Sequence, residues 1–338
     1  MPAQTAPRSS QQKGTNLSVI LHTVVCEIAI VEKRVAAASQ LQKELSSITP
    51  AVKHIVTSKG KYLRPALVLL SCAACGCEPA KAVEHAALTE LIHLGSLVFD
   101  DLLDGSTIRR GRETVNSKWS NETALLTAAR VYLEVVNRTA HEKESSRDIM
   151  VKTVNRMFTG EVLQFGSHGK TNITEKEYLT IITEKSASLF SACCQLGAIA
   201  AEADENTVTA LKKYGLNLGI AFQIMDDLLN IFADEKKLGK RVGSDIEDAR
   251  LTLPIIELLH KLPNSDRKRL KKMLKNNDNS IELTELRKMI KETGVYDSVV
   301  AKARKYTTSA VASVKNFNNS QSLDSLLSLC EFVVLREY

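Results

Sequence analysis

Residues 96–104 read SLVFDDLLD, so three carboxylates are set into an otherwise apolar run. On a helix, Asp100 and Asp104 stand at i and i+4 and lie on one face, one turn apart. Residues 222–230 read FQIMDDLLN and repeat the pattern, with Asp226 followed by an amide four residues later. Such carboxylates repel one another unless a cation lies between them, and oxygen-only ligands suit Mg²⁺. One motif alone fits the wet end of a half-buried helix about as well, but two of them predict a shared Mg²⁺ site.

The rest of the chain is patterned for helices. From Leu17 onward apolar residues recur every three or four positions, and the 15 Gly and 7 Pro in 338 residues are too few for a sandwich or barrel. We find no repeat and no interdomain linker, so the sequence predicts one all-α domain, a single large helical bundle at 17–338, behind a disordered N-terminal segment at 1–16. Residues 106–121 are expected to form a loop or a short broken helix, and 234–250 a charged loop. The expected helices span about 62–75, 79–104, 123–137, 145–165, 174–203, 206–233, 254–262, 265–275, 281–292, 295–314 and 322–337.

Composition excludes several classes of protein. A quarter of the residues are charged and 44% are apolar, which rules out a disordered chain, a collagen-like repeat and a disulfide-stapled miniprotein. The formal net charge of +6 is too mild for a dedicated nucleic-acid binder. The dense basic stretch at 267–275 is interleaved with Leu and Met, so we interpret it as a solvated helix face. The longest uncharged apolar stretch, 186–201, is too short to span a bilayer comfortably.

Cysteine usage and the first residues bear on location. The seven cysteines are odd in number and lie mostly in apolar runs, which indicates free, buried thiols in a reducing, cytoplasmic setting. Zinc at Cys72, Cys75 and Cys77 is the minor alternative, because no second Cys/His pair stands at zinc-ribbon spacing. Residues 1–16 have no apolar signal-peptide core, although two basic residues without an acid leave organelle targeting open.

Several basic residues follow the same logic, and Arg109 and Arg110 lie just past the first acidic motif. Singly, each fits a surface salt bridge, but a polyphosphate requires both Mg²⁺ and cationic donors, and Arg binds phosphate oxygens in pairs. Together with the acids they predict a pocket for two diphosphate groups. The candidates are Lys61, Arg64, Arg109, Arg110, Lys185 and Lys240.

Several motifs, in their order along the chain, resemble those of the trans-isoprenyl diphosphate synthases (polyprenyl synthetases) of the medium- or long-chain type. The similarity runs from about residue 53 to 258, with a fainter match at 332–338. The motifs are GKYLRP at 60–65, ELIH at 90–93, DDLLD at 100–104, RRG at 109–111, GEVLQ at 160–164, KSA at 185–187, FQIMDD at 222–227, GKRVGSD at 239–245 and TLP at 252–254.

The resemblance implies an isoprenoid synthase-like fold, with helices around a central cavity, and usually a homodimer. It implies a prenyltransferase that joins isopentenyl diphosphate head to tail to an allylic diphosphate by Mg²⁺-assisted ionisation. By position, Asp100, Asp104 and Asp226 would bind Mg²⁺, and Arg109, Lys185 and Lys240 would neutralise the allylic diphosphate. Lys61, Arg64, His93 and Arg110 would hold isopentenyl diphosphate, and Gln223 would lie near the allylic cation. Asp101 and Asp227 would support these groups.

Two departures from the family pattern keep alternatives open. Asn230 stands where an Asp is usual, and residues 126–130, LTAAR, replace a usual Gly-Asp. One alternative is a partly active or regulatory subunit of a heteromeric polyprenyl diphosphate synthase. The other is a class I terpene cyclase of the same fold, although a cyclase would not need Lys61 and Arg64.

Small residues one turn before Asp100 bear on product length. If Asp100 faces the cavity, Gly95 and Ser96 face the channel for the growing chain. In the family a bulky aromatic residue here stops elongation early, so we expect a product of C20 at least and more often C30 or longer. Such a product enters a membrane, so peripheral membrane contact is expected for its release.

Overall fold

The computed structural model describes residues 16–40, 42–58, 60–232, 250–275 and 283–336. In this part of the chain the structure is almost wholly helical, with one two-stranded hairpin, as the all-α prediction requires. The N-terminal elements are α1 (Leu17–Ile20), α2 (Val25–Ala36), α3 (Thr49–Val56), α4 (Leu63–Ala74) and α5 (Val83–Leu103), with short 3₁₀ turns between them. The hairpin strands β1 (Ile108–Arg109) and β2 (Arg112–Glu113) precede α6 (Val115–Lys118), α7 (Asn121–Thr139), α8 (Glu144–Ser167) and α9 (Glu175–Ile182). The remaining helices are α10 (Ser188–Ala200), α11 (Glu205–Phe232), α14 (Leu253–Lys261), α15 (Asn264–Lys275), α16 (Leu283–Glu292), α17 (Val295–Ser313) and α18 (Gln321–Leu335).

Local sequence signals start several of these helices. The Ser120 hydroxyl accepts a hydrogen bond from the Thr123 backbone N–H at the start of α7. Thr174 and Glu177 form a capping box that begins α9. Pro254 occupies the first turn of α14, where its missing N–H costs nothing.

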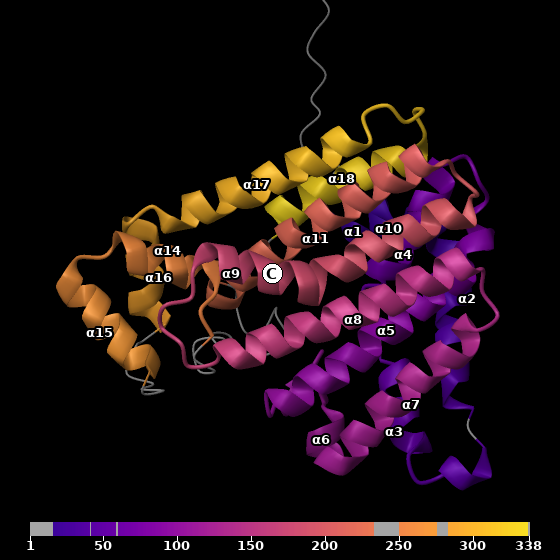
Figure 1. The fold of residues 1–338 in the computed structure, drawn as a ribbon, viewed down its shortest axis with the longest axis horizontal. Helices are drawn as coiled ribbons and strands as arrows, with labels where there is room; N and C mark the ends of the chain where they lie inside the picture. The colour runs from indigo at the N-terminus through magenta and orange to yellow at the C-terminus, as the bar shows by residue number, and fades with distance from the viewer. Residues whose placement is uncertain (1–15, 41, 59, 233–249, 276–282, 337–338) are drawn as a thin grey trace, which may run out of the picture.

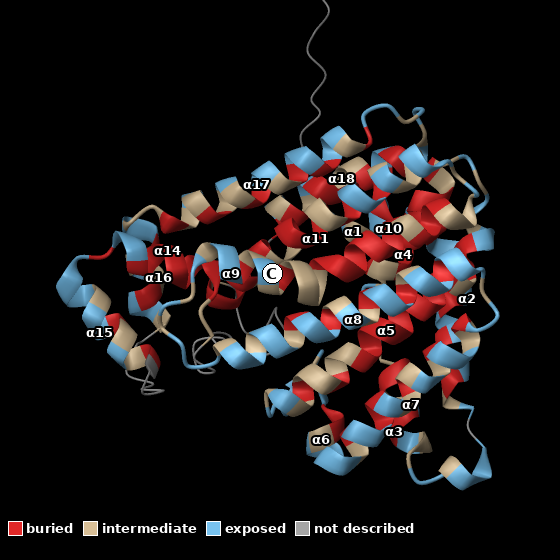
Figure 2. Ribbon diagram, in the orientation of Figure 1, coloured by how far each residue is buried: buried red, intermediate tan, exposed pale blue. Residues whose placement is uncertain are grey.

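The core lies where α4, α5, α10 and α11 meet. Figure 1 shows α17 and α18 along one side of this group, α2, α3 and α7 towards the other, and α14, α15 and α16 together at one end. In Figure 2 most of α4 and α10 and the first half of α5 are coloured as buried. The backbones of α10 and α4 approach closely, since a Cβ on Gly197 would lie 2.3 Å from the Val68 carbonyl oxygen. The long α5 and α11, which carry the two acidic motifs, are therefore fixed from several sides.

A hairpin follows α5 where a loop or short broken helix was expected. Arg110 and Gly111, at its tip, both have positive φ (53° and 72°), as a two-residue type I′ turn requires. Glycine adopts this conformation freely, but Arg110 does so at a cost in backbone strain. The sequence signal for this hairpin is the pair Arg110-Gly111, which forms the turn, followed by Arg112 and Glu113, which form the second strand.

The single helix expected over 174–203 is interrupted. A π-helical turn, Thr183–Ala187, separates α9 from α10 and carries Lys185. A Cβ on Gly160 of α8 would lie 2.2 Å from the Lys185 backbone nitrogen, so only glycine allows α8 to approach this turn. The sequence does not reveal this interruption, because residues 183–187, TEKSA, contain no Gly or Pro that would mark the end of a helix.

Some predictions fall partly or wholly outside the described residues. These include residues 1–15, most of the 234–250 loop and Lys240, so the boundary at residue 16 stays a prediction. All seven cysteines are free, as expected, although Cys26 is exposed rather than buried. No helix among the described residues is both long and apolar enough to cross a membrane.

Candidate active site

A cavity of about 870 Å³ opens between α4, α5, α8, α9 and α11. Both acidic motifs and both groups of basic residues line it, although they come from distant parts of the sequence. The structure therefore brings together all of the predicted site residues that it describes, except Gly95. The predicted residues on the cavity wall are Lys61, Arg64, His93, Ser96, Asp100, Asp104, Arg109, Arg110, Lys185, Gln223 and Asp226.

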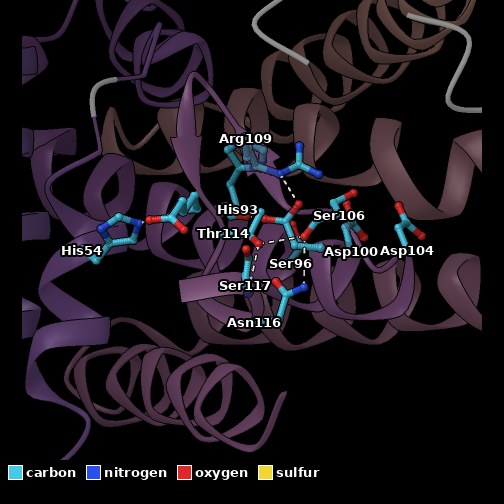
Figure 3. Close-up of polar contacts among 12 residues, drawn as sticks. His54, His93, Ser96, Asp100, Asp104, Ser106, Arg109, Thr114, Asn116 and Ser117 are labelled. Carbon is cyan, nitrogen blue, oxygen red and sulfur yellow. Dashed lines mark hydrogen bonds and ion pairs between the residues drawn. The ribbon is translucent and has the colours of Figure 1, made fainter. Parts of the chain in front are cut away.

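The first acidic motif faces cations from other elements. The Lys185 ammonium lies 3.1 Å from an Asp100 carboxylate oxygen and 2.6 Å from Glu161 on α8. Burial lowers the pKa of Lys185, but the two carboxylates outweigh it, so the net shift is upward and Lys185 stays charged. Asp104 forms an ion pair with Arg250. In Figure 3, Asp100 and Asp104 follow one another along α5, as their spacing predicts.

Asp101 turns away from this pair and anchors the hairpin. Arg109 donates to an Asp101 carboxylate oxygen at 2.6 Å, drawn in Figure 3. Burial raises the pKa of Asp101 to about 6, and the neighbouring Arg109 limits that rise. Thr114 and Asn116 both donate to the Ser106 carbonyl, at 2.7 and 3.0 Å, which closes the base of the hairpin. Arg109 is thus held at the rim of the cavity.

The second acidic motif meets the end of the chain. Arg336, just after α18, lies 3.2 Å from an Asp226 carboxylate oxygen and donates to the Phe222 carbonyl at 2.9 Å. Its guanidinium also stacks over the Phe222 ring, 3.9 Å from the centroid. The Arg336 side chain is only 3% exposed. This buried cation therefore fixes the C-terminal helix against the acidic face of α11.

A directional hydrogen-bond chain orients Gln223. The Ser186 hydroxyl donates to Gln223 Oε1 at 2.8 Å, and Gln223 Nε2 donates to Asp227 Oδ1 at 2.7 Å. The Tyr178 hydroxyl donates to the other Asp227 oxygen at 2.6 Å. Because a hydroxyl lies at one end of the amide and a carboxylate at the other, the Gln223 side chain is held in one orientation. Asp227 is buried and accepts from both Gln223 and Tyr178, so its supporting role stays a prediction that this geometry permits.

A second basic group lies around the start of α4. Arg64 is half-buried, donates to His93 Nε2 at 3.0 Å and stacks on the Phe190 ring. Burial, followed by the charges of Arg64 and Arg110, holds the pKa of His93 well below its usual value. His93 is therefore a neutral acceptor that orients Arg64. Burial, followed by nearby Arg336, also lowers the pKa of Lys61.

Backbone geometry aims the remaining basic residues. Tyr62, before α4, has a φ of 48°, a left-handed conformation that is rare for a bulky residue and separates Lys61 from the helix. A Cβ on Gly60 would lie 2.8 Å from an Arg110 guanidinium nitrogen. The glycine of the GKYLRP motif thus makes room for Arg110 beside Lys61 and Arg64. Backbone strain such as that at Tyr62 is typical of functional sites, where side chains must converge on a ligand.

Lys185 has a further support that the sequence did not reveal. Arg156 on α8 binds the neighbouring Glu184 through two hydrogen bonds of 2.8 and 2.7 Å. Such paired contacts fix orientation as well as distance. The π-helical turn is therefore attached to α8 through this pair, through Gly160 and through Glu161.

The apolar end of the cavity corrects one prediction. Ser96 lines the cavity, but Gly95 does not, because a Cβ there would lie 2.9 Å from the Tyr132 ring. Tyr132, from α7, fills the space that Gly95 leaves, and its ring lies 5.9 Å from that of Phe99. The expectation that Gly95 opens onto the channel was wrong, since sequence spacing on α5 could not show what α7 contributes.

The donor set suits a metal that is also held by its substrate. Among the described residues, no three His, Cys, Asp or Glu side chains converge on one metal position. Asp100, Asp104 and Asp226 each offer carboxylate oxygen towards the cavity, and each is near a cation of the protein. Mg²⁺ commonly uses one or two carboxylates and completes its shell with water and phosphates. These residues therefore fit a metal bound together with a diphosphate.

Sequence reasoning missed several residues on the cavity wall. Tyr132 and Tyr178 lie in helices without a charged motif, and Arg250 and Arg336 lie far from their acidic partners in the chain. Glu161 stood in the GEVLQ motif, which was noted without a role. Only the fold could reveal these contacts.

Comparisons with known proteins agree on one family. The family model described as polyprenyl synthetase matches residues 46–292. A short chain isoprenyl diphosphate synthase of Methanothermobacter thermautotrophicus is 32% identical over 89% of this chain and 96% of its own. Heptaprenyl diphosphate synthase component 2 of Geobacillus stearothermophilus is 36% identical over 69% of this chain and 72% of its own. A crystal structure of a polyprenyl synthase from Caulobacter crescentus, complexed with calcium and isoprenyl diphosphate, superposes with a TM-score of 0.89 at 27% identity, covering 97% of this chain and 100% of that one.

Proposed function

The chain belongs to the polyprenyl synthetase family and is a prenyltransferase, and we propose that it joins isopentenyl diphosphate head to tail to an allylic diphosphate. The product would be an all-trans polyprenyl diphosphate of C20 or longer, and we favour a length of C30 or longer. One observation supports this above all: a single cavity is lined by two acidic helix faces and by a separate group of basic residues, Lys61, Arg64 and Arg110. Those are the groups that two diphosphate substrates need.

The acidic side would hold the allylic diphosphate. Asp100, Asp104 and Asp226 would bind Mg²⁺, which when present neutralises negative charge on the leaving diphosphate. Lys185 lies beside Asp100, and Arg109, which is paired with Asp101, lines the same cavity; both would supply further positive charge where the C–O bond breaks. Lys240, outside the described residues, is assigned to the same group by its motif alone.

The basic side would hold isopentenyl diphosphate. Arg64 is oriented by His93, Arg110 lies beside Gly60, and Lys61 adds a third positive charge. Neutral His93 accepts from Arg64 and so does not compete for the diphosphate. A cyclase that takes one diphosphate substrate has no use for this second basic group, which counts against the cyclase alternative.

Carbon–carbon bond formation would take place between the two sides. The double bond of isopentenyl diphosphate attacks the allylic cation, and the proton then lost goes to the released diphosphate. Gln223, held in one orientation, can stabilise the cation with its amide oxygen. Phe222, Leu189 and Phe99 line the same cavity and limit the access of water, which would quench the cation.

Product length would be set where the apolar end of the cavity closes. Ser96 leaves room beside α5, whereas Tyr132 and Phe99 narrow the space beyond it. We expect the tail to pass these rings by a side-chain rotation of Tyr132. A product no longer than C15 would show that the rings are a fixed floor.

A dimer is supported by an apolar surface on α7 and α8. Eight large apolar side chains on these two helices are at least half exposed, and exposed apolar surface of this kind commonly marks an interface. They are Leu125, Leu126, Leu133 and Val136 on α7, and Val151, Phe158, Val162 and Phe165 on α8. A second copy of the chain is the occupant we propose.

The alternative is a heteromer. It is favoured by the likeness to a protein named component 2. Buried Asn230, in place of the usual acid, fits an enzyme of weaker activity.

The experiment is a direct assay. The purified chain is incubated with Mg²⁺, labelled isopentenyl diphosphate and farnesyl or geranylgeranyl diphosphate, and products are sized by mass spectrometry. We expect incorporation that stops when Mg²⁺ is removed. Products without label would indicate a cyclase, and activity that appears only when a partner subunit is added would indicate the heteromeric alternative.

A further inference from the structure

The positive charge of this protein is concentrated on one helix. Residues 261–275 contain seven basic residues and one acid, a net +6 that equals the formal net charge of the whole chain. The rest of the sequence is balanced. The helix α15 holds most of this segment, so the protein has one strongly cationic end rather than a diffuse positive surface.

The helix presents its cations outward. Leu270 and Leu274 are buried against the protein, whereas Lys268, Arg269 and Lys272 are exposed. Lys268 and Lys272 have no ion pair in the part of the chain that the structure describes. Arg269 has one contact, 3.8 Å to Glu285, and both side chains are about half exposed or more, so the pair is weak. We call Lys268, Arg269 and Lys272 the α15 basic face.

Not every basic residue of the segment belongs to this face. Arg267 donates to the carbonyls of Leu262 and His260, at 2.9 and 3.2 Å, and so fixes the turn between α14 and α15. Lys261 donates to the Thr293 carbonyl at 3.0 Å. These two residues hold the helix in place, which makes the α15 basic face a rigidly mounted surface.

The α15 basic face is joined to the cavity wall by one short helix. Figure 1 shows α15 at one end of the long axis, beside α14 and α16. Thr252, on the cavity wall, immediately precedes α14, and the nine residues of α14 span about 14 Å before the chain turns into α15. A surface that binds α15 would therefore lie one helix away from the cavity wall at Thr252.

We propose that the α15 basic face holds the protein against an anionic lipid bilayer. Clusters of Lys and Arg on an amphipathic helix bind anionic headgroups by charge alone. The two leucines point into the protein, so the helix would adsorb to the surface without inserting. The helix carries no aromatic residue on which nucleic-acid bases could stack, which favours lipid over single-stranded nucleic acid. The reason for membrane contact rests on the proposed function, because a long apolar product must leave water.

The test is cosedimentation of the full chain with vesicles. Neutral vesicles of phosphatidylcholine are compared with vesicles containing about 30% phosphatidylglycerol, at about 0.1 M and about 0.5 M salt. We expect binding to the anionic vesicles at low salt only. The variant Lys268→Glu/Arg269→Glu/Lys272→Glu should bind at least about a hundred-fold more weakly, since each cation contributes roughly five-fold.

A matched variant controls for net charge. Lys33→Glu/Lys213→Glu/Lys315→Glu changes the charge equally at exposed sites on α2, α11 and the turn after α17. It should lose several-fold less affinity than the α15 variant. Equal loss by both variants, binding to neutral vesicles, or binding of duplex DNA but not of anionic vesicles would overturn the proposal. Vesicle binding is measured without substrate, and prenyl transfer is measured without vesicles. A protein that does not bind vesicles can therefore still show prenyl transfer, and the two results are independent.

Discussion

Tyr178 offers a sharp test of how the active site is organised. Its hydroxyl donates to Asp227, which in turn accepts from Gln223, and the Tyr178 side chain is only 3% exposed. Tyr178→Phe removes this hydroxyl and keeps the ring, so no cavity is created. A hydrogen bond to a carboxylate contributes about 1.5–3 kcal/mol, so we expect the free energy of unfolding to fall by about 2 kcal/mol.

The same change should affect catalysis selectively. Without the phenol, Asp227 and the Gln223 amide can rotate, and we expect kcat to fall about ten-fold, which corresponds to about 1.4 kcal/mol of barrier. The KM for isopentenyl diphosphate should stay within about two-fold, because Lys61 and Arg64 are untouched. Unfolding in urea and initial rates with labelled isopentenyl diphosphate at saturating Mg²⁺ give both quantities.

Tyr214 supplies the matched control. It is fully buried and donates to the Leu326 carbonyl, also at 2.6 Å, but it does not line the cavity. Tyr214→Phe should lower stability by about 1 kcal/mol and leave kcat unchanged. Ser186→Ala combined with Tyr178→Phe should cost less in kcat than the two changes added, because both act on Gln223. If Tyr178→Phe lowers stability but not kcat, the hydrogen-bond chain is structural and the reasoning is refuted.

Three further predictions follow from single contacts. Burial raises the pKa of Asp101 to about 6, so this group's contribution to stability is complete below about pH 4 and is lost as the pH rises through 6. In urea unfolding between pH 4 and 7, the wild type should therefore lose about 3 kcal/mol more of its free energy of unfolding than Asp101→Asn does. Parallel curves of stability against pH would contradict this. Tyr132→Ala should lengthen the product by at least one isoprene unit in mass spectra, and an unchanged distribution would place the floor elsewhere. Gly160→Ala should push α8 away from Lys185, which should lower the free energy of unfolding by about 1–3 kcal/mol. The same variant should lose at least ten-fold in kcat/KM for the allylic substrate. Wild-type kinetics would show that the close approach of α8 is dispensable.

The sequence was sufficient for the architecture and for most of the polar site. Apolar periodicity gave the helices to within a few residues, and the i and i+4 spacing of Asp100 and Asp104 placed both on the cavity wall. Those inferences succeed because they depend on local geometry. Charge logic also extended across the fold: Lys185 was chosen as a cation for the acidic region, and it lies 3.1 Å from Asp100.

The sequence failed where a contact depends on two distant elements. Gly95 was expected to open onto the channel, but Tyr132 from α7 fills that space. The π-helical turn at Lys185 depends on how closely α8 approaches, and no local pattern encodes that distance. Arg336 was noted only as part of a faint terminal match, yet it is buried on Phe222 beside the second acidic motif.

The central claim is that α5 and α11 act on one metal-bound diphosphate across the cavity. Calorimetric titration of Mg²⁺ and inorganic diphosphate into wild type, Asp100→Asn, Asp226→Asn and the double variant measures this directly. If both carboxylates hold the same group, each single change should weaken binding about ten-fold and the double change little more, a coupling of at least about 1 kcal/mol. Free energies that add to within about 0.5 kcal/mol would mean that the two acidic faces work independently, and would contradict the account.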